Sequence, residues 1–368
     1  MDSATVTQPA PAKPAVMPVR PISPQRPVRS PFLVRTIRMR PRLYSAICRT
    51  RMFYSRRIAG AENRKTFLRN HALFVLNHFE AQQVRSLRNL GYALIPAFFP
   101  GTTIDRIYEI SHALFHGLAI DPSRAYSVQT GERSSLDGVS YEELAATEKM
   151  IALRDPLVQI PQVVDLAFHE SILRIAANFL GYVPPLYRVT LVRDFPHDQP
   201  LHSSNFHKDN DETDSLQIFI YLVDIDDTRG PLVYVPRSNH YDVRSCRPRL
   251  SRDLGIAGNS GRFSDEEIER VYPRAEWFAL RTVRGSIAMI HGNGIHKGPS
   301  WTRPGDPANR PRTAIKLDLH GCKAGVIRDG KENRMRRRDY ERLTDLQKLF
   351  AHATLTEEQI AVAAHASD

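Results

Sequence analysis

The sequence predicts a mixed α+β protein with a β-barrel or β-sandwich core and helices packed outside it. Three observations support this fold class: helical periodicity dominates residues 62–180, short β-rich runs occupy residues 186–319, and helical periodicity returns after residue 337. The chain has 368 residues, of which 42% are hydrophobic and 25% are charged. This length and composition are typical of a globular protein with a sizeable core.

Residues 1–60 differ in composition from the rest of the chain. Nine prolines lie within residues 1–42, and each proline fixes a backbone angle and removes an amide donor, so we expect a disordered Pro/Arg-rich tail. Of the 51 basic and 40 acidic residues, twelve and one lie in residues 1–58, which leaves 39 of each sign elsewhere. Because the remainder is neutral overall, we expect no nucleic-acid partner.

Residues 32–57 are Arg-rich with interleaved apolar side chains, and three interpretations compete. We favour a solvated basic tail. The alternatives are a surface helix attracted to anionic lipid or an acidic partner, and a mitochondrial transit peptide, which the prolines oppose. Residues 1–58 are therefore expected to make at most a weak contact with an anionic surface. The sequence predicts no oligomeric state.

This chain lacks the sequence signals of several protein classes. The apolar run at residues 216–223 is far shorter than the ~20 residues of a transmembrane helix, and no apolar signal-peptide region is present. Cys48, Cys246 and Cys322 are an odd count without a Cys-x-x-Cys motif, so neither a disulfide framework nor a zinc motif is expected. The cytoplasm is the default location. Nucleotide-binding, serine-hydrolase and zincin motifs are also absent.

The N-terminal half of the folded region is expected to be mainly helical. Apolar spacing predicts helical segments at residues 62–91, a short strand at residues 92–96 and a second helix at residues 103–118. Residues 121–150 are polar and contain glycines and serines, so we expect a loop. Residues 161–180 are expected to form one helix that ends at the following glycine.

The middle of the chain is expected to form strands. Short β-rich runs separated by turn sequences occupy residues 186–195, 216–223, 232–235, 286–290 and 313–319. Ser264-Asp-Glu-Glu267 has the pattern of a capping box, in which serine and glutamate side chains bond to the backbone of a first helical turn. A short helix is therefore expected to interrupt the strands.

His207-Lys208-Asp209 places an imidazole and a carboxylate two residues apart, where both can lie on one side of a strand edge. With a second histidine from a distant part of the chain, such a pair makes the 2-His-1-carboxylate site that holds Fe(II) and leaves positions open. The motif alone is weak, because 14 His and 23 Asp predict about one His-x-Asp by chance and a second occurs at His240-Tyr241-Asp242. The surrounding sequence distinguishes the two.

An ordered series of segments follows the first motif. An apolar strand leads into Gly230-Pro-Leu-Val-Tyr-Val-Pro-Arg-Ser-Asn-His240, then Gly285-Ser-Ile-Ala-Met-Ile-His-Gly-Asn-Gly-Ile-His296-Lys-Gly298, and finally Asn309-Arg-Pro-Arg312 before another strand. This series resembles the phytanoyl-CoA dioxygenase family of Fe(II)- and 2-oxoglutarate-dependent oxygenases. The resemblance extends over roughly residues 91–319, and it implies a double-stranded β-helix, the cupin-like jelly roll.

The resemblance implies that His207, Asp209 and His296 are the Fe(II) ligands and form the catalytic centre. His291 is a rival for the distal position. We assign the role to His296 because its His-Lys-Gly context matches the family, and we interpret His291 as a loop histidine. Two departures from the family pattern, an inserted Asn239 and His291 in place of an acid, do not involve an assigned ligand.

The resemblance also implies a basic residue that binds the far carboxylate of 2-oxoglutarate, and we assign this role to Arg312. A guanidinium group offers a planar pair of donors that matches a carboxylate, and Arg312 directly precedes the Thr-Ala-Ile strand, as in the family. Arg310 is the alternative, which we interpret as a solvated loop arginine. Tyr221 occupies the family's aromatic position, where it contacts either 2-oxoglutarate or only the protein core.

The expected protein therefore has a tail at residues 1–60 and a single oxygenase domain at residues 61–368, with its jelly-roll core at about residues 185–320. The resemblance implies hydroxylation of a small-molecule substrate with O2 and 2-oxoglutarate, releasing succinate and CO2. The alternative is a catalytically silent jelly-roll protein that binds a metabolite and docks through the basic tail. The sequence does not identify the substrate.

Overall fold

The computed structural model describes residues 61–117, 125–128, 139–197, 204–209, 215–239, 262–301, 305–320 and 333–361. The chain separates into two units, Met1–Tyr44 and Ser45–Asp368, and all described residues belong to the second. The predicted tail at residues 1–60 and the second His-x-Asp motif at His240 lie outside the described residues. The expectations for them stay predictions.

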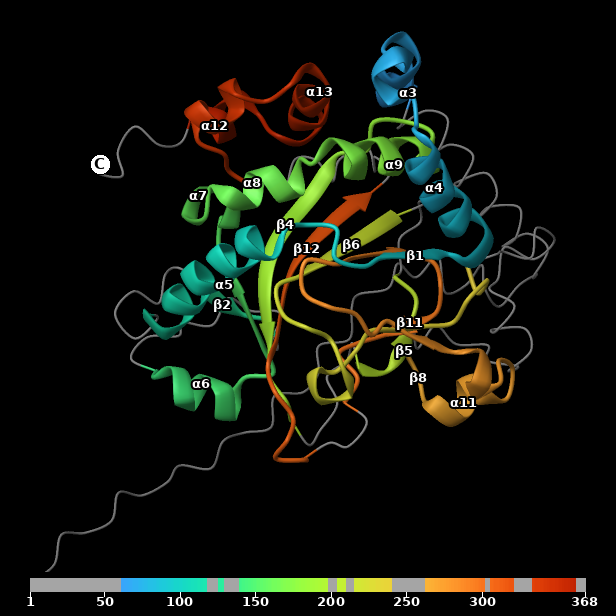
Figure 1. Cartoon of the computed structure of the whole chain (residues 1–368), viewed down its shortest axis with the longest axis vertical. Coiled ribbons are helices and arrows are strands. Elements are labelled where there is room, and N and C mark those ends of the chain that lie inside the picture. Colours follow the sequence, from blue (N-terminus) through green and yellow to red (C-terminus); the bar gives the residue numbers. More distant parts are fainter. Residues whose placement is uncertain are drawn as a thin grey trace, which may run out of the picture. The chain divides into compact units, whose positions relative to one another are not determined.

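Two antiparallel sheets form the centre of a mixed α+β fold (Figure 1). The larger sheet has seven strands, in the order β1 (Tyr92–Ile95), β10 (Ile287–His291), β6 (Ser215–Tyr221), β12 (Arg312–His320), β4 (Leu186–Asp194), β3 (Met150–Leu153) and β2 (Ala125–Ser127). The smaller sheet has five short strands, in the order β8 (Arg262–Phe263), β5 (Phe206–His207), β11 (His296–Lys297), β7 (Val233–Tyr234) and β9 (Phe278–Ala279). Each predicted strand is present, with its ends shifted by at most two residues.

The larger sheet separates two apolar clusters because successive side chains of a strand point to opposite faces. On β6, Ile218 and Ile220 belong to a large cluster that the helices complete. Phe219 and Tyr221 belong to a second cluster, to which Tyr234 of the smaller sheet contributes. The face of β6 that carries Phe219 and Tyr221 therefore faces the smaller sheet. We call this face of the larger sheet the inner face.

Helices surround the larger sheet on the side of the first cluster. They are α3 (Ala61–Arg69), α4 (His78–Leu90), α5 (Gly101–His116), α7 (Pro156–Gln159), α8 (Gln162–Ala167), α9 (Glu170–Leu180), α12 (Arg337–Glu341), α13 (Asp345–Thr354) and α14 (Glu357–Ala361). Helix α9 follows α8 along the strands in Figure 1 and contacts both α4 and α13. Glycine residues in the left-handed conformation, Gly91 and Gly181, end α4 and α9, as the sequence predicts for the latter.

Two sequence-based expectations in the helical half are wrong. The single helix expected at residues 161–180 is two helices, because His169 takes an extended conformation between α8 and α9 and its ring packs against Phe98 and Phe99. The loop expected at residues 121–150 contains β2 and α6 (Tyr141–Thr147). The edge strand β2 is too short to give an alternating pattern. The predicted capping box of Ser264 and Glu267 is confirmed and opens α11 (Asp265–Glu269).

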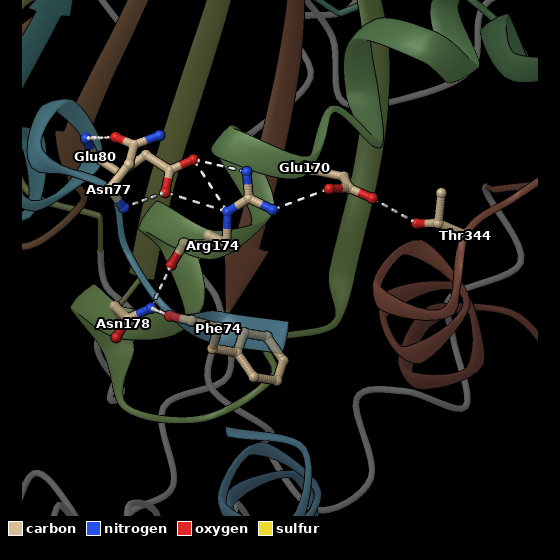
Figure 2. Close-up of polar contacts among 7 residues, drawn as sticks. All are labelled: Phe74, Asn77, Glu80, Glu170, Arg174, Asn178 and Thr344. Atoms are coloured by element: carbon tan, nitrogen blue, oxygen red, sulfur yellow. Dashed lines mark hydrogen bonds and ion pairs between the residues drawn. The ribbon is translucent and has the colours of Figure 1, made fainter. Parts of the chain in front are cut away.

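A buried ion network joins three helices on the side of the first cluster (Figure 2). The carboxylate of Glu80 on α4 accepts hydrogen bonds from the guanidinium of Arg174 on α9 at 2.9 and 3.0 Å. Arg174 also donates to Glu170 at 2.9 Å, and Glu170 accepts from the hydroxyl of Thr344, which caps α13. Burial by itself would raise the pKa of Glu80, but hydrogen bonds from Arg174, Ser171 and the Asn77 backbone outweigh it and lower that pKa.

Among the described residues, no helix combines the length and apolar character that crossing a membrane requires.

Candidate metal centre

The structure brings His207, Asp209 and His296 together on the smaller sheet. Strands β5 and β11 pair so that His207 lies directly opposite His296, and their ring centroids are 4.4 Å apart. Asp209 follows two residues after His207, and its backbone N–H donates to the carbonyl of Gly292 at 3.0 Å. One ligand atom from each of the three side chains lies within 4.8 Å of the other two, and His296 Nε2 is 3.9 Å from Asp209 Oδ2.

Both imidazole rings are oriented in the same way by the backbone. Nδ1 of His207 lies 2.9 Å from the carbonyl oxygen of Asn205, and Nδ1 of His296 lies 2.9 Å from that of Gly294. A carbonyl oxygen can only accept a hydrogen bond, so Nδ1 carries the proton and Nε2 presents a lone pair. Such bonds from the second ring nitrogen orient histidines that bind metals.

Burial keeps the two histidines neutral. Burial, together with the positive charges of Lys316, Arg262 and Lys208, lowers the pKa of His296 to about 4. Burial and the neighbouring His296 also lower the pKa of His207. Neutral imidazole is the form that binds a metal ion, so both rings are in the binding form at neutral pH.

A residue of the larger sheet holds the carboxylate of Asp209 in place. The side-chain amide of Gln217 on β6 donates to Asp209 Oδ2 at 2.6 Å. The turn between β10 and β11 also needs close approach, since a Cβ atom on Gly292 would lie 2.8 Å from Asp209 Oδ2 and one on Gly294 would overlap the hydroxyl of Tyr234. Glycine at these two positions allows the turn to reach the three side chains.

His291 is not part of this cluster. It ends β10, its ring packs edge-on against Phe179 at 5.5 Å, and its Nδ1 accepts the backbone N–H of Asn293 at 3.1 Å. These contacts support its interpretation as a structural histidine.

Arg312 begins β12 on the inner face and is already paired. Its guanidinium donates to Asp194 Oδ2 of β4 through Nε at 2.9 Å and lies 2.8 Å from the same oxygen through Nη2. Nη1 donates to the carbonyl of Gly230 at 3.0 Å. These bonds use three of the five N–H groups of the side chain, so two remain. Arg310, by contrast, is exposed and pairs with Asp226.

Three buried hydroxyl groups on the inner face have no hydrogen-bond partner among the described residues. They belong to Tyr221 and Ser215 on β6, of which Tyr221 is fully buried, and to Thr190 on β4, which is 5% exposed. Burial raises the pKa of Tyr221 to about 12, and the charges of Arg312 and Asp194 also act on this group, so all three lie close together. An unsatisfied buried hydroxyl costs stability, and a bound ligand could accept its hydrogen bond.

Sequence reasoning missed Gln217 and Asp194. Gln217 is the polar residue inside the apolar run at residues 216–223, at a position whose parity matches Tyr221, and that interruption was a usable signal. Asp194 gave no such signal, because its pairing with Arg312 depends on the register between β4 and β12.

The chemistry of the donors fits ferrous iron. Two neutral imidazole nitrogens and one carboxylate on one side of a site form the donor set typical of non-haem Fe(II) oxygenases. The unsatisfied hydroxyl of Tyr221 lies close to Arg312, and both groups are able to donate hydrogen bonds to a carboxylate.

Comparison with protein families gives a clear result. The family described as "Phytanoyl-CoA dioxygenase (PhyH)" matches residues 87–302, which are 216 of the 368 residues. The matched range includes His207, Asp209 and His296, whereas Arg312 lies beyond it. A search of curated proteins gives no match.

Similar solved structures include two proteins with a bound metal and one epimerase complex. "EctD from S. alaskensis with bound Fe" is 17% identical, with 66% of this chain and 76% of that chain covered and a TM-score of 0.42. "HygX from Streptomyces hygroscopicus with nickel and 2-oxoglutarate bound" is 14% identical, with 67% and 87% covered and a TM-score of 0.43. "The epimerase SnoN in complex with Fe3+, alpha ketoglutarate and nogalamycin RO" is 16% identical, with 66% and 83% covered and a TM-score of 0.44.

Proposed function

Because the chain belongs to the phytanoyl-CoA dioxygenase family of Fe(II)- and 2-oxoglutarate-dependent oxygenases, we propose that it hydroxylates a small-molecule substrate and releases succinate and CO2. The observation that carries this proposal is the convergence of His207, Asp209 and His296, with both Nε2 atoms available. These three side chains would hold Fe(II). Bound Fe(II) with 2-oxoglutarate supplies the activation of O2, and the protein supplies the binding site and the orientation.

Arg312 and Tyr221 are the proposed anchors for the far carboxylate of 2-oxoglutarate. The bonds to Asp194 fix the guanidinium, and its two remaining N–H groups can form a bidentate pair with a carboxylate. The hydroxyl of Tyr221 can supply a further donor. Asp194 would then position Arg312 without contacting the co-substrate.

The proposed domain organisation follows from the same arrangement. Residues 61–368 would form one oxygenase domain with a jelly-roll core at about residues 185–320, as the two facing antiparallel sheets support. The smaller sheet and the turn after β5 would carry the proposed iron ligands, and the larger sheet would carry the proposed anchors for 2-oxoglutarate. The double-stranded β-helix is the form of this architecture that brings both sets of side chains to one interior.

An anaerobic titration tests the proposal. Purified protein with Fe(II) and 2-oxoglutarate should develop a visible charge-transfer band, which should be lost in His207→Ala. His291→Ala is the matched control, since His291 is also a buried histidine near the site, and it should keep the band. A wild-type protein that binds Fe(II) and shows no band with 2-oxoglutarate would contradict the proposal.

The second candidate is a catalytically silent jelly-roll protein that binds a metabolite and docks through its basic tail. The bonding of Arg312 to Asp194 favours it, because the ion pair already offsets the charge that would attract the co-substrate. Succinate release in the absence of an added substrate, even at a low rate, distinguishes the two. The silent protein would release none.

A further inference from the structure

Lys316 projects from β12 onto the inner face close to the metal centre. It lies opposite Phe219 of β6, and its Nζ is 5.7 Å from the centre of the Phe219 ring. One inner-face position further along each strand, Asp318 lies opposite Gln217, whose amide holds Asp209. Lys316 therefore lies within one strand position of the side chain that orients a proposed iron ligand.

The charge around Lys316 is only partly offset by the described side chains. Its Nζ is 3.2 Å from Asp318 Oδ1, but Asp318 Oδ2 is also bound by Arg188 through Nε and Nη2 at 2.9 and 2.8 Å. One carboxylate is thus shared by two cations. Asp318 is buried, whereas 23% of the Lys316 side chain is exposed.

A second, independent feature lies directly across from Lys316. Thr190 on β4 occupies the opposite position in the register, and its hydroxyl is one of the three buried inner-face hydroxyls without a partner among the described residues. A buried hydroxyl without a partner is costly unless a ligand accepts its hydrogen bond. A cation and a hydroxyl donor side by side match the oxygen atoms of a carboxylate or a phosphate.

The same pairing of a cation with an unsatisfied hydroxyl occurs at Arg312 and Tyr221, which we assign to 2-oxoglutarate. Arg312 and Lys316 are four residues apart on one strand, so their Cα atoms are separated by about 13 Å. The Arg312 guanidinium is held at Asp194 and Gly230, whereas the Lys316 ammonium group lies at Asp318, further along β12 from Arg312, so one carboxylate would not contact both. 2-Oxoglutarate has two carboxylates, one of which would be used at the iron and the other at Arg312, so the second pair would have no role in binding the co-substrate.

We propose that Lys316 and Thr190 bind an acidic group of the substrate, a carboxylate or a phosphate, and thereby select an anionic small molecule. The inference rests on the proposed oxygenase function and names the substrate class of the same site. Arg188 and Asp318 would hold the Lys316 side chain in place.

Small anions test this directly in the complex with Fe(II) and 2-oxoglutarate. We would titrate the anaerobic complex with acetate, with inorganic phosphate and with neutral acetamide at constant ionic strength, and follow the charge-transfer band. Acetate or phosphate should perturb the band saturably, and acetamide should not. The apparent Kd should rise at least about tenfold in Lys316→Met, the loss expected for a hydrogen bond to a charged group.

Matched variants separate this site from other anion effects. Lys316→Arg should restore most of the affinity, Thr190→Val should raise the Kd about threefold, and the exposed Arg310→Met should change nothing. Direct binding of the anion to iron would persist in Lys316→Met. The response of this variant is therefore subtracted from that of the wild type. A response to acetate alone assigns a carboxylate, and a response to phosphate alone assigns a phosphate.

Three outcomes are decisive. A wild-type band that no anion perturbs more than acetamide does would overturn the inference. So would loss of the band itself in Lys316→Met, since Lys316 would then serve 2-oxoglutarate. Absence of the band in the wild type would instead contradict the proposed function, so the two failures are distinguishable.

Discussion

Two buried polar regions of this molecule differ in how completely their polar groups are paired. In the ion network of the helical layer, both oxygens of Glu80 accept hydrogen bonds, and Arg174 donates to two carboxylates (Figure 2). On the inner face, the hydroxyls of Tyr221 and Thr190 have no partner within the described parts of the chain. The first region is complete without a ligand, and the second is not.

This difference indicates that the helical layer serves stability and that the inner face serves binding. A buried ion pair whose hydrogen bonds are all formed holds the helices together, and removing one member leaves the other without its buried partner. Unsatisfied donors cost stability and are tolerated where a ligand completes them. Substitutions in the helical layer should therefore change the free energy of unfolding, whereas substitutions on the inner face should change binding and turnover.

The largest expected effect is the loss of turnover in Asp209→Asn. The amide keeps the shape of the carboxylate but removes the charge that Fe(II) needs, so succinate formation should fall to background while the unfolding free energy changes by no more than about 1 kcal/mol. Asp226→Asn, at an exposed ion pair, is the control and should keep full turnover. A destabilised Asp209→Asn protein would break the separation between the two regions.

The next largest effect is destabilisation by Glu80→Gln. The substitution leaves Arg174 without its buried partner, and we expect a loss of about 3 kcal/mol in the free energy of unfolding, measured by denaturant titration. Turnover by the folded protein should be unchanged. In the control Glu170→Gln the carboxylate is 38% exposed, so the loss should be about 1 kcal/mol or less. Equal losses in both variants would contradict the assigned role of burial.

Gln217→Leu should weaken metal binding by about 10- to 100-fold, because the amide that orients Asp209 is lost. Isothermal titration with Fe(II) under anaerobic conditions measures the change. The buried Gln83 on α4 provides the control, and Gln83→Leu should bind iron as the wild type does. Unchanged affinity in Gln217→Leu would show that the backbone alone orients Asp209.

Tyr221→Phe should raise the KM for 2-oxoglutarate by about three- to tenfold and leave stability unchanged or higher, because the removed hydroxyl has no partner in the described structure. Tyr141→Phe is the contrasting variant. Its hydroxyl accepts from the buried Arg193 at 2.9 Å, so its removal should cost about 1–2 kcal/mol and leave the KM unchanged. A stability loss in Tyr221→Phe would show that its hydroxyl is already bonded.

The smallest expected effect is a change in the slope of stability against pH. Since folding lowers the pKa of Glu80 below its ordinary value of 4.5, its stabilisation is fully present above that value and is lost as the pH falls through the folded-state pKa. Acid unfolding of Glu80→Gln should therefore be less steep than that of the wild type below about pH 4.5. Parallel curves would show that this carboxyl has the same pKa in both states.

Both the strands and the proposed iron ligands could be predicted from the sequence. Alternation and turn sequences located β4, β6, β10 and β12 within one or two residues, because these signals are properties of neighbouring residues. The assignment of His207, Asp209 and His296 came from a resemblance in the order of motifs. It stays a proposal about ligation, which the convergence of the three side chains supports.

The amino-acid sequence by itself therefore determined which faces of the strands are apolar and which residues are chemically able to bind iron. Only the tertiary structure decided that His207 lies opposite His296, that both rings bond to the backbone through Nδ1, and that Arg312 pairs with Asp194. Local periodicity follows from backbone geometry within a few residues. Strand register and partner choice depend on the packing of distant segments, and one sequence does not encode that packing in any local pattern.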